Sequence, residues 1–159
     1  MGANSGESRS LTAMFKVMLA LHLLAAIFAI GPLVHAATTA SRGLRQKDTA
    51  ALSASVRTLR IYSIASVAVV IFGFGLMSAT DPDTGKVTAT FGQLWIWLSV
   101  LLWLAAVGLC HALVVPALVR AGGDVEQAPS LVGRVAAGGG IIGVIFAVIV
   151  FLMVYRPGA

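Results

Sequence analysis

Four long apolar stretches, separated by short polar segments, dominate the pattern along this chain. Each stretch is long enough to supply the roughly 20 apolar residues that an α-helix needs to cross the hydrocarbon core of a membrane. We therefore predict an all-α fold, namely a polytopic membrane protein with four transmembrane helices in a bundle. The predicted spans are residues 11–37, 50–79, 92–120 and 131–155.

The polar segments define the expected domain organisation. Residues 1–10 are rich in glycine and serine and predict a flexible N-terminal tail, so residues 11–159 would form one four-helix transmembrane domain. The expected loops are residues 38–47, 80–90 and 120–130. The candidate helix N-caps, each a short polar residue at the start of a helical segment, are Ser10, Asp48 and Ser130.

Composition narrows the class of protein further. Hydrophobic residues make up 58% of the chain and charged residues only 11%, whereas charged residues make up about 25% of typical soluble domains. These proportions exclude an ordinary soluble domain and a disordered chain. The single cysteine, Cys110, lies inside an apolar run, which excludes an internal disulfide and a cysteine zinc site and predicts a buried core residue.

The first apolar run, from Val17 to Ala37, follows basic residues as a signal peptide would. It is about 21 residues long, whereas the apolar region of a signal peptide has about 7–15 residues. We therefore expect a retained membrane helix.

Basic residues are distributed unequally between the two predicted sides of the membrane. Of the eleven lysines and arginines, seven lie in or beside the first and third loops: Arg42, Arg45, Lys47, Arg57, Arg60, Arg120 and Arg134. The four on the other side are Arg9, Lys16, Lys86 and Arg156. Because basic loops favour the cytoplasm, we predict a multi-pass protein of the bacterial plasma membrane with both termini outside and residues 38–60 and 120–134 in the cytoplasm.

The first basic segment is also a candidate lipid site. Cationic side chains beside a bilayer attract anionic lipid headgroups, and arginine can extend its head toward them. The candidate headgroup ligands are Arg42, Arg45, Lys47, Arg57 and Arg60. We attribute the net charge of +5 to basic residues that set the membrane topology and attract anionic lipid. We therefore expect no nucleic-acid partner.

Small residues recur at helical spacing in the last two spans. Gly139, Gly143 and Ala147 form a stripe in the fourth span, and Gly108 and Ala112 form a shorter one in the third. Such stripes let membrane helices approach closely. They predict either packing inside the bundle or a docking face for a partner protein. In the third span, Pro116 predicts a bend.

No aspartate or glutamate lies inside any predicted span. Proton-coupled transporters generally need an intramembrane carboxylate or a comparable relay, and the chain has no phosphate-binding loop, serine elbow or dinucleotide motif. We therefore predict that the protein is not an enzyme and has no cofactor or metal. An oligomeric small transporter or channel is one alternative, but Ser63, Ser66 and Gln93 would give it a sparse polar lining.

Histidines offer a second alternative, because one histidine on each of two helices can hold a b-type haem. Measured from the centres of their spans, His22 and His111 differ in depth by about 13 Å, but His35 and His111 differ by only about 6 Å. Axial ligands need almost equal depth, so a haem-binding electron carrier would use His35 and His111. The competing interpretation is that each histidine is hydrogen-bonded within the bundle or at its interface.

The segment LALHLLAAIFAIGPLVHA, from Leu19 to Ala36, has a histidine early in the first span and a Gly-Pro pair near its end. In this and in its general plan the chain resembles small four-helix integral membrane proteins of unassigned function from actinobacteria. Some small proteins of this kind are accessory subunits of the actinobacterial cytochrome bcc–aa3 respiratory supercomplex. The resemblance thus implies a partner complex and no catalytic residues.

These observations together predict a non-catalytic integral membrane accessory subunit. Its partners would be the lipid bilayer, anionic lipids at the inner basic loop, and larger integral membrane subunits that it helps to assemble or stabilise. The expected host is a respiratory complex of the cytochrome bcc–aa3 type.

Overall fold

The computed structural model describes residues 3–80, 85 and 87–157, with side chains from Arg9 onward in these ranges. Its elements are α1 (Ala3–Ala25), η1 (Ala26–Ile30), α2 (Gly31–Gln46), α3 (Thr49–Met77), α4 (Leu94–Leu109), η2 (Cys110–Val114), α5 (Val115–Gly123), η3 (Val125–Gln127) and α6 (Ala128–Tyr155). They join into four helical stretches that are long and apolar enough to cross a membrane. The predicted all-α class and the number of candidate spans are therefore confirmed.

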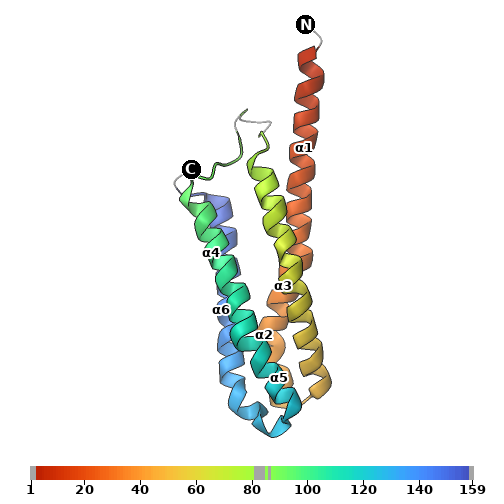
Figure 1. Ribbon diagram of the computed structural model, residues 1–159, viewed down its shortest axis with the longest axis vertical. Coiled ribbons are helices and arrows are strands. Elements are labelled where there is room, and N and C mark those ends of the chain that lie inside the picture. The colour runs from red at the N-terminus through yellow and green to blue at the C-terminus, as the bar shows by residue number, and fades with distance from the viewer. Residues whose placement is uncertain (1–2, 81–84, 86, 158–159) are drawn as a thin grey trace.

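The four stretches run up and down, so that the α2–α3 and α5–α6 turns lie at one end and both termini at the other (Figure 1). At the end with the two turns, α2 packs on α3 and α6, and α5 packs on α3 and α6. Toward the other end, the chain separates into an α1–α3 pair and an α4–α6 pair (Figure 1). The main core lies where all the stretches meet and includes Leu33, Ala37, Leu44, Leu59, Leu118 and Ile142.

The expected loop at residues 38–47 is wrong, because α2 continues through this segment to Gln46. Ala40, Gly43 and Leu44 are buried, and Leu52 of α3 lies against Gly43. The packing of these small and apolar residues on α3 outweighs the loop tendency that their polar neighbours suggest. The helix ends where Lys47 adopts a left-handed conformation, with φ of 51°.

Of the three predicted N-caps, the structure confirms only Asp48, whose carboxylate accepts a hydrogen bond from the Ala51 amide at 3.0 Å. Ser10 lies inside α1, because residues 3–10 are helical where a tail was expected. Ser130 lies inside α6, where its hydroxyl donates to the Gln127 carbonyl at 2.7 Å. Proline in the first turn of α6 moves the helix start upstream of Ser130, since proline there needs no donor.

Two wide π-helical turns interrupt the long stretches, and each ends two residues before a proline. The η2 turn precedes Pro116, where a bend was predicted, and the η1 turn precedes Pro32. Proline has no amide hydrogen and its ring crowds the preceding turn, so the regular helical ladder cannot continue through it. A locally wider turn is one way for a helix to accommodate this interruption.

The connection between α3 and α4 closes the end that carries the termini. Thr80 and Val87 form an isolated antiparallel bridge, and the Arg156 guanidinium donates to the Thr88 carbonyl at 3.3 Å. Arg156 also lies over the Trp95 ring, 5.8 Å from its centroid. The middle of the predicted turn, residues 81–84 and 86, lies outside the described residues.

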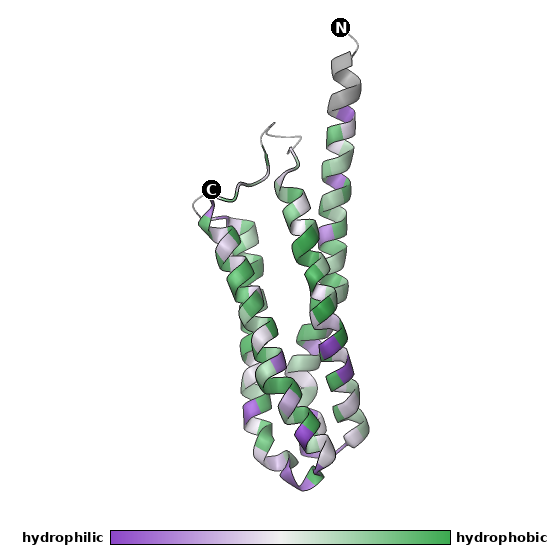
Figure 2. Cartoon of the chain, in the orientation of Figure 1, coloured by the Kyte–Doolittle hydropathy of each residue, from purple (hydrophilic) through white to green (hydrophobic). Residues whose placement is uncertain are grey.

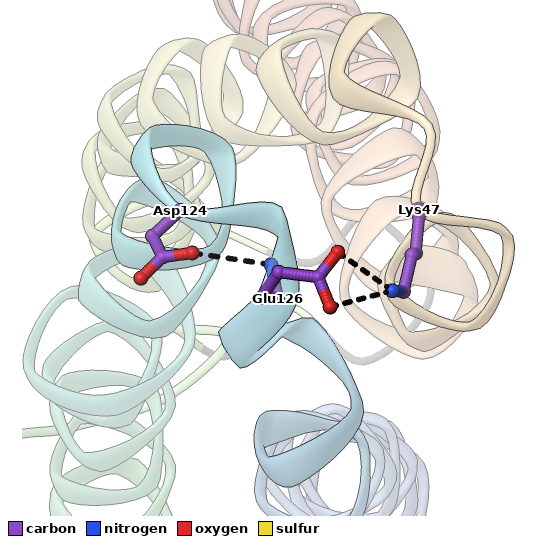
Figure 3. Close-up of polar contacts among 3 residues, drawn as sticks. All are labelled: Lys47, Asp124 and Glu126. Carbon is purple, nitrogen blue, oxygen red and sulfur yellow. Dashed lines mark hydrogen bonds and ion pairs between the residues drawn. The ribbon is translucent and has the colours of Figure 1, made fainter.

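At the opposite end, an ion pair joins the two helix turns. Lys47 Nζ lies 3.0 and 3.2 Å from the two carboxylate oxygens of Glu126, and Asp124 accepts from the Glu126 amide at 3.2 Å (Figure 3). The first and third connections thus share one side, as the charge pattern predicted. Hydrophilic positions gather at this end, and apolar positions cover the long helices (Figure 2).

Candidate functional site

The most polar part of the bundle interior is a ladder of hydrogen bonds along α3. Ser63 Oγ lies 2.8 Å from Nε2 of His111 in η2, and Trp103 Nε1 of α4 donates to Ser66 Oγ at 3.0 Å. The Ser63 oxygen also lies 3.0 Å from the Arg60 carbonyl, to which its hydroxyl can donate. Two serines three residues apart therefore attach α3 to the third stretch.

The same helix is attached to α1 by a buried histidine. His22 Nδ1 lies 2.9 Å from the Val69 carbonyl, and since a carbonyl only accepts, Nδ1 carries the hydrogen. The ring lies against Gly73, where an added Cβ would be 3.2 Å from His22 Cε1. The absence of a side chain at Gly73 thus makes room for the imidazole, a relation that sequence spacing did not indicate.

The polar groups inside the bundle are paired. In the part of the chain that the structure describes, every buried side-chain nitrogen and oxygen has a hydrogen-bond partner. Within the same residues, no group of three His, Cys, Asp or Glu side chains could hold a metal ion. Ser63 and Ser66, considered above as a channel lining, are instead occupied between helices.

The two histidines of the haem alternative have different surroundings. Both residues are exposed, but His111 is hydrogen-bonded to Ser63 of α3. The elements that carry them, α2 and η2, both pack on α6 but are not a main packing pair with each other. This arrangement gives the haem alternative no support. Cys110 is a buried free thiol, as expected.

The glycine stripe of the fourth span faces α2 over only part of its length. A Cβ at Gly139 would overlap the backbone carbonyl of Ala37, and one at Gly143 would lie 3.6 Å from Thr38 Cγ2. Ala147, further along, is exposed. The stripe thus begins as internal packing and emerges at the surface where α2 and α6 diverge.

The shorter stripe of the third stretch lies entirely at the surface. Gly108 and Ala112 are both exposed, and a Cβ at Gly108 would meet no atom within 4 Å. Of the two predicted stripes, this one is the open apolar face.

The basic residues separate into three groups. Lys47 is paired with Glu126, and Arg42 and Arg45 are exposed on α2. Arg57 and Arg60 line a groove of about 560 Å³ between α3 and α5. The sequence predicted all five as headgroup ligands but could not place two of them beside a groove.

The first helix continues past the end of its partner. Met18 lies beside Gly75, only two residues before α3 ends at Met77. From Ala3 to Phe15, α1 therefore extends beyond α3 for about 20 Å at 1.5 Å per residue. This projection is visible above the other helices in Figure 1.

Apolar side chains on the projection have little cover. Leu11 is 42% exposed and Met14 48%. Leu11 and Phe15 continue the helical spacing of Met18 and His22, the residues that contact α3. The spacing was visible in the sequence, but the sequence did not show where α3 ends beside α1. The uncovered part of α1 was therefore not predicted.

The chain matches no protein-family model, no curated protein and no solved structure with which it was compared. The fold therefore defines the class alone: an all-helical bundle with four helices of membrane-spanning length and composition.

Proposed function

We propose that this protein is a non-catalytic integral membrane accessory subunit that docks onto a larger membrane complex. The observation that carries the proposal is the projection of α1 beyond the end of α3, residues Ala3–Phe15, with its exposed Leu11 and Met14. An isolated helix of this length is marginally stable in water. A partner protein that packs on its apolar side would stabilise it.

The position of the aromatic residues supports the view that this projection leaves the bilayer. Trp95 and Trp97 at the start of α4 and Tyr155 at the end of α6 lie at the end of the bundle where α3 terminates. Tryptophan and tyrosine are enriched at membrane–water interfaces. With the interface at this level, lipid covers the exposed side chains of the spans but not those of Leu11 and Met14.

The chemistry of the interior supports a role by packing. Ser63, Ser66 and His22 are engaged in bonds between helices, and polar contacts of this kind hold membrane helices together at about 0.6 kcal/mol each. In this proposal the protein resides in the bacterial plasma membrane with both termini outside. The resemblance of the first span suggests a cytochrome bcc–aa3 respiratory supercomplex as the host, with larger integral membrane subunits as partners.

Purification from native membranes in a gentle detergent, followed by mass spectrometry, tests the proposal. We expect the wild-type chain to carry a stoichiometric integral membrane partner. The variant Leu11→Ser/Met14→Ser should lose that partner at least tenfold while keeping its melting temperature, because both side chains lie outside the bundle core.

Val87→Ser is the matched control, since Val87 is 53% exposed at the same end of the molecule but lies outside α1. It should retain the partner. Recovery of the wild-type chain alone, or equal loss of the partner in both variants, would contradict docking through α1.

A further inference from the structure

The groove between α3 and α5 combines an apolar wall with two arginines. Its apolar lining comes from Leu52, Val56 and Ile61 of α3 and from Leu118 and Val119 of α5. Its polar lining comes from Arg57, Arg60, Thr49 and Ser53. A second hollow of about 580 Å³ adjoins it and shares Ser53, Arg57 and Ile61. The two hollows together form a surface with one charged rim and one apolar side.

The two arginines have no counter-charge within the described structure. Arg57 and Arg60 are three residues apart on one helical face, which places their Cβ atoms about 5–6 Å apart. In residues 9–80 and 87–157, neither guanidinium forms an ion pair, and the one ion pair at this end joins Lys47 to Glu126. Like charges at this spacing repel each other, so an anion bound between them would stabilise the pair.

The depth of the groove matches a lipid headgroup. From Met77, at the far end of α3, to Arg60 is about 26 Å along the helix, close to the hydrocarbon thickness of about 30 Å. Arg57 lies about one turn further out. The guanidinium groups therefore reach the headgroup region, and Ile61 marks the start of the apolar part of α3.

We propose that this groove binds one anionic phospholipid, with its phosphate held by Arg57 and Arg60 and the start of an acyl chain lying along Ile61 toward the apolar part of α3. Guanidinium groups bind phosphate through paired charge-assisted hydrogen bonds. A lipid bound there also covers Ile61 and the apolar part of α3 beyond it, which a water-soluble phosphate would leave uncovered. This site goes beyond docking through α1, lies at the opposite end of the bundle and can fail or hold independently of it.

The proposed site is tested by native mass spectrometry of the delipidated protein. Phosphatidylglycerol or phosphatidylcholine is added back, and the fraction of protein with bound lipid is measured. Phosphatidylglycerol should bind wild type in preference to phosphatidylcholine. Because one basic residue contributes about fivefold to affinity for an anionic membrane surface, Arg57→Gln/Arg60→Gln should weaken phosphatidylglycerol binding by roughly thirtyfold. Glycerol 3-phosphate at millimolar concentration should not displace the lipid.

Arg120→Gln/Arg134→Gln is the matched control, since it removes two exposed arginines at the same end of the molecule but outside the groove. We expect less than a twofold change, and a melting temperature for each variant verifies that the bundle is intact. An equal loss of phosphatidylglycerol binding in the two double variants would overturn the site. It would show that basic residues at this end attract anionic lipid without a defined groove. Equal binding of the two lipids, or displacement by glycerol 3-phosphate, would also overturn it.

Discussion

At the scale of single residues, the closest helix contact in the bundle depends on the absence of one side chain. Gly139 lets α6 approach the backbone of α2 so closely that a Cβ would overlap the Ala37 carbonyl. Backbone cannot yield as a flexible side chain can. The contact therefore requires glycine at this position.

We predict that Gly139→Ala lowers the stability of the folded protein by about 1–3 kcal/mol, the usual range for overpacking. Thermal unfolding in detergent measures the change. Gly140→Ala is the control, because Gly140 is exposed and a Cβ added there would meet no atom within 4 Å. Equal melting temperatures for the two variants would show that α2 and α6 do not pack through Gly139.

Sequence reasoning at this scale found residue types but not their neighbours. The Gly139 stripe was identified from spacing, yet spacing could not decide between internal packing and an open face. Among the histidines, hydrogen bonding within the bundle was one of two interpretations, and His22 and His111 adopt it. Their partners, the Val69 carbonyl and the Ser63 hydroxyl, depend on how the helices are rotated, which a single sequence does not specify.

At the scale of elements, α1 depends on α3 for its attachment to the bundle. The two helices pack along one side, and the buried bond from His22 to the Val69 carbonyl lies within this contact. The α4–α6 pair packs separately toward the same end (Figure 1). Weakening the His22 contact should therefore affect α1 and spare α6.

We predict that His22→Phe accelerates hydrogen exchange in α1 by about threefold, corresponding to about 0.6 kcal/mol for one polar contact between membrane helices. Exchange in α6 should not change. His35→Phe is the control, because His35 is exposed on α2. An equal effect of the two substitutions, or none from His22→Phe, would show that this bond does not hold α1 to the bundle.

Helix number followed from the length of the apolar stretches, but helix ends did not. Asp48 was predicted correctly because capping is a local interaction with the next turn. Residues 38–46 were assigned to a loop from their polarity, whereas their small side chains pack on a neighbouring helix. Tail residues 3–10 were likewise assigned from composition, although they continue α1.

At the scale of the whole molecule, the two ends of the bundle differ. One end has two short turns joined by the Lys47–Glu126 ion pair and carries the arginine groove (Figure 3). The other end has diverging helix pairs and the projecting α1 (Figure 1). The proposed lipid site and the proposed docking site thus occupy opposite ends, and each can be altered without the other.

The most direct measurement is photo-cross-linking in native membranes. A benzoylphenylalanine at position 11, on the projection, is compared with one at position 71, whose isoleucine is 61% exposed on α3 within the span. Docking through α1 predicts one discrete adduct with an integral membrane protein from position 11 and no such adduct from position 71. No protein adduct from position 11, or the same adducts from both positions, would contradict the proposed accessory role.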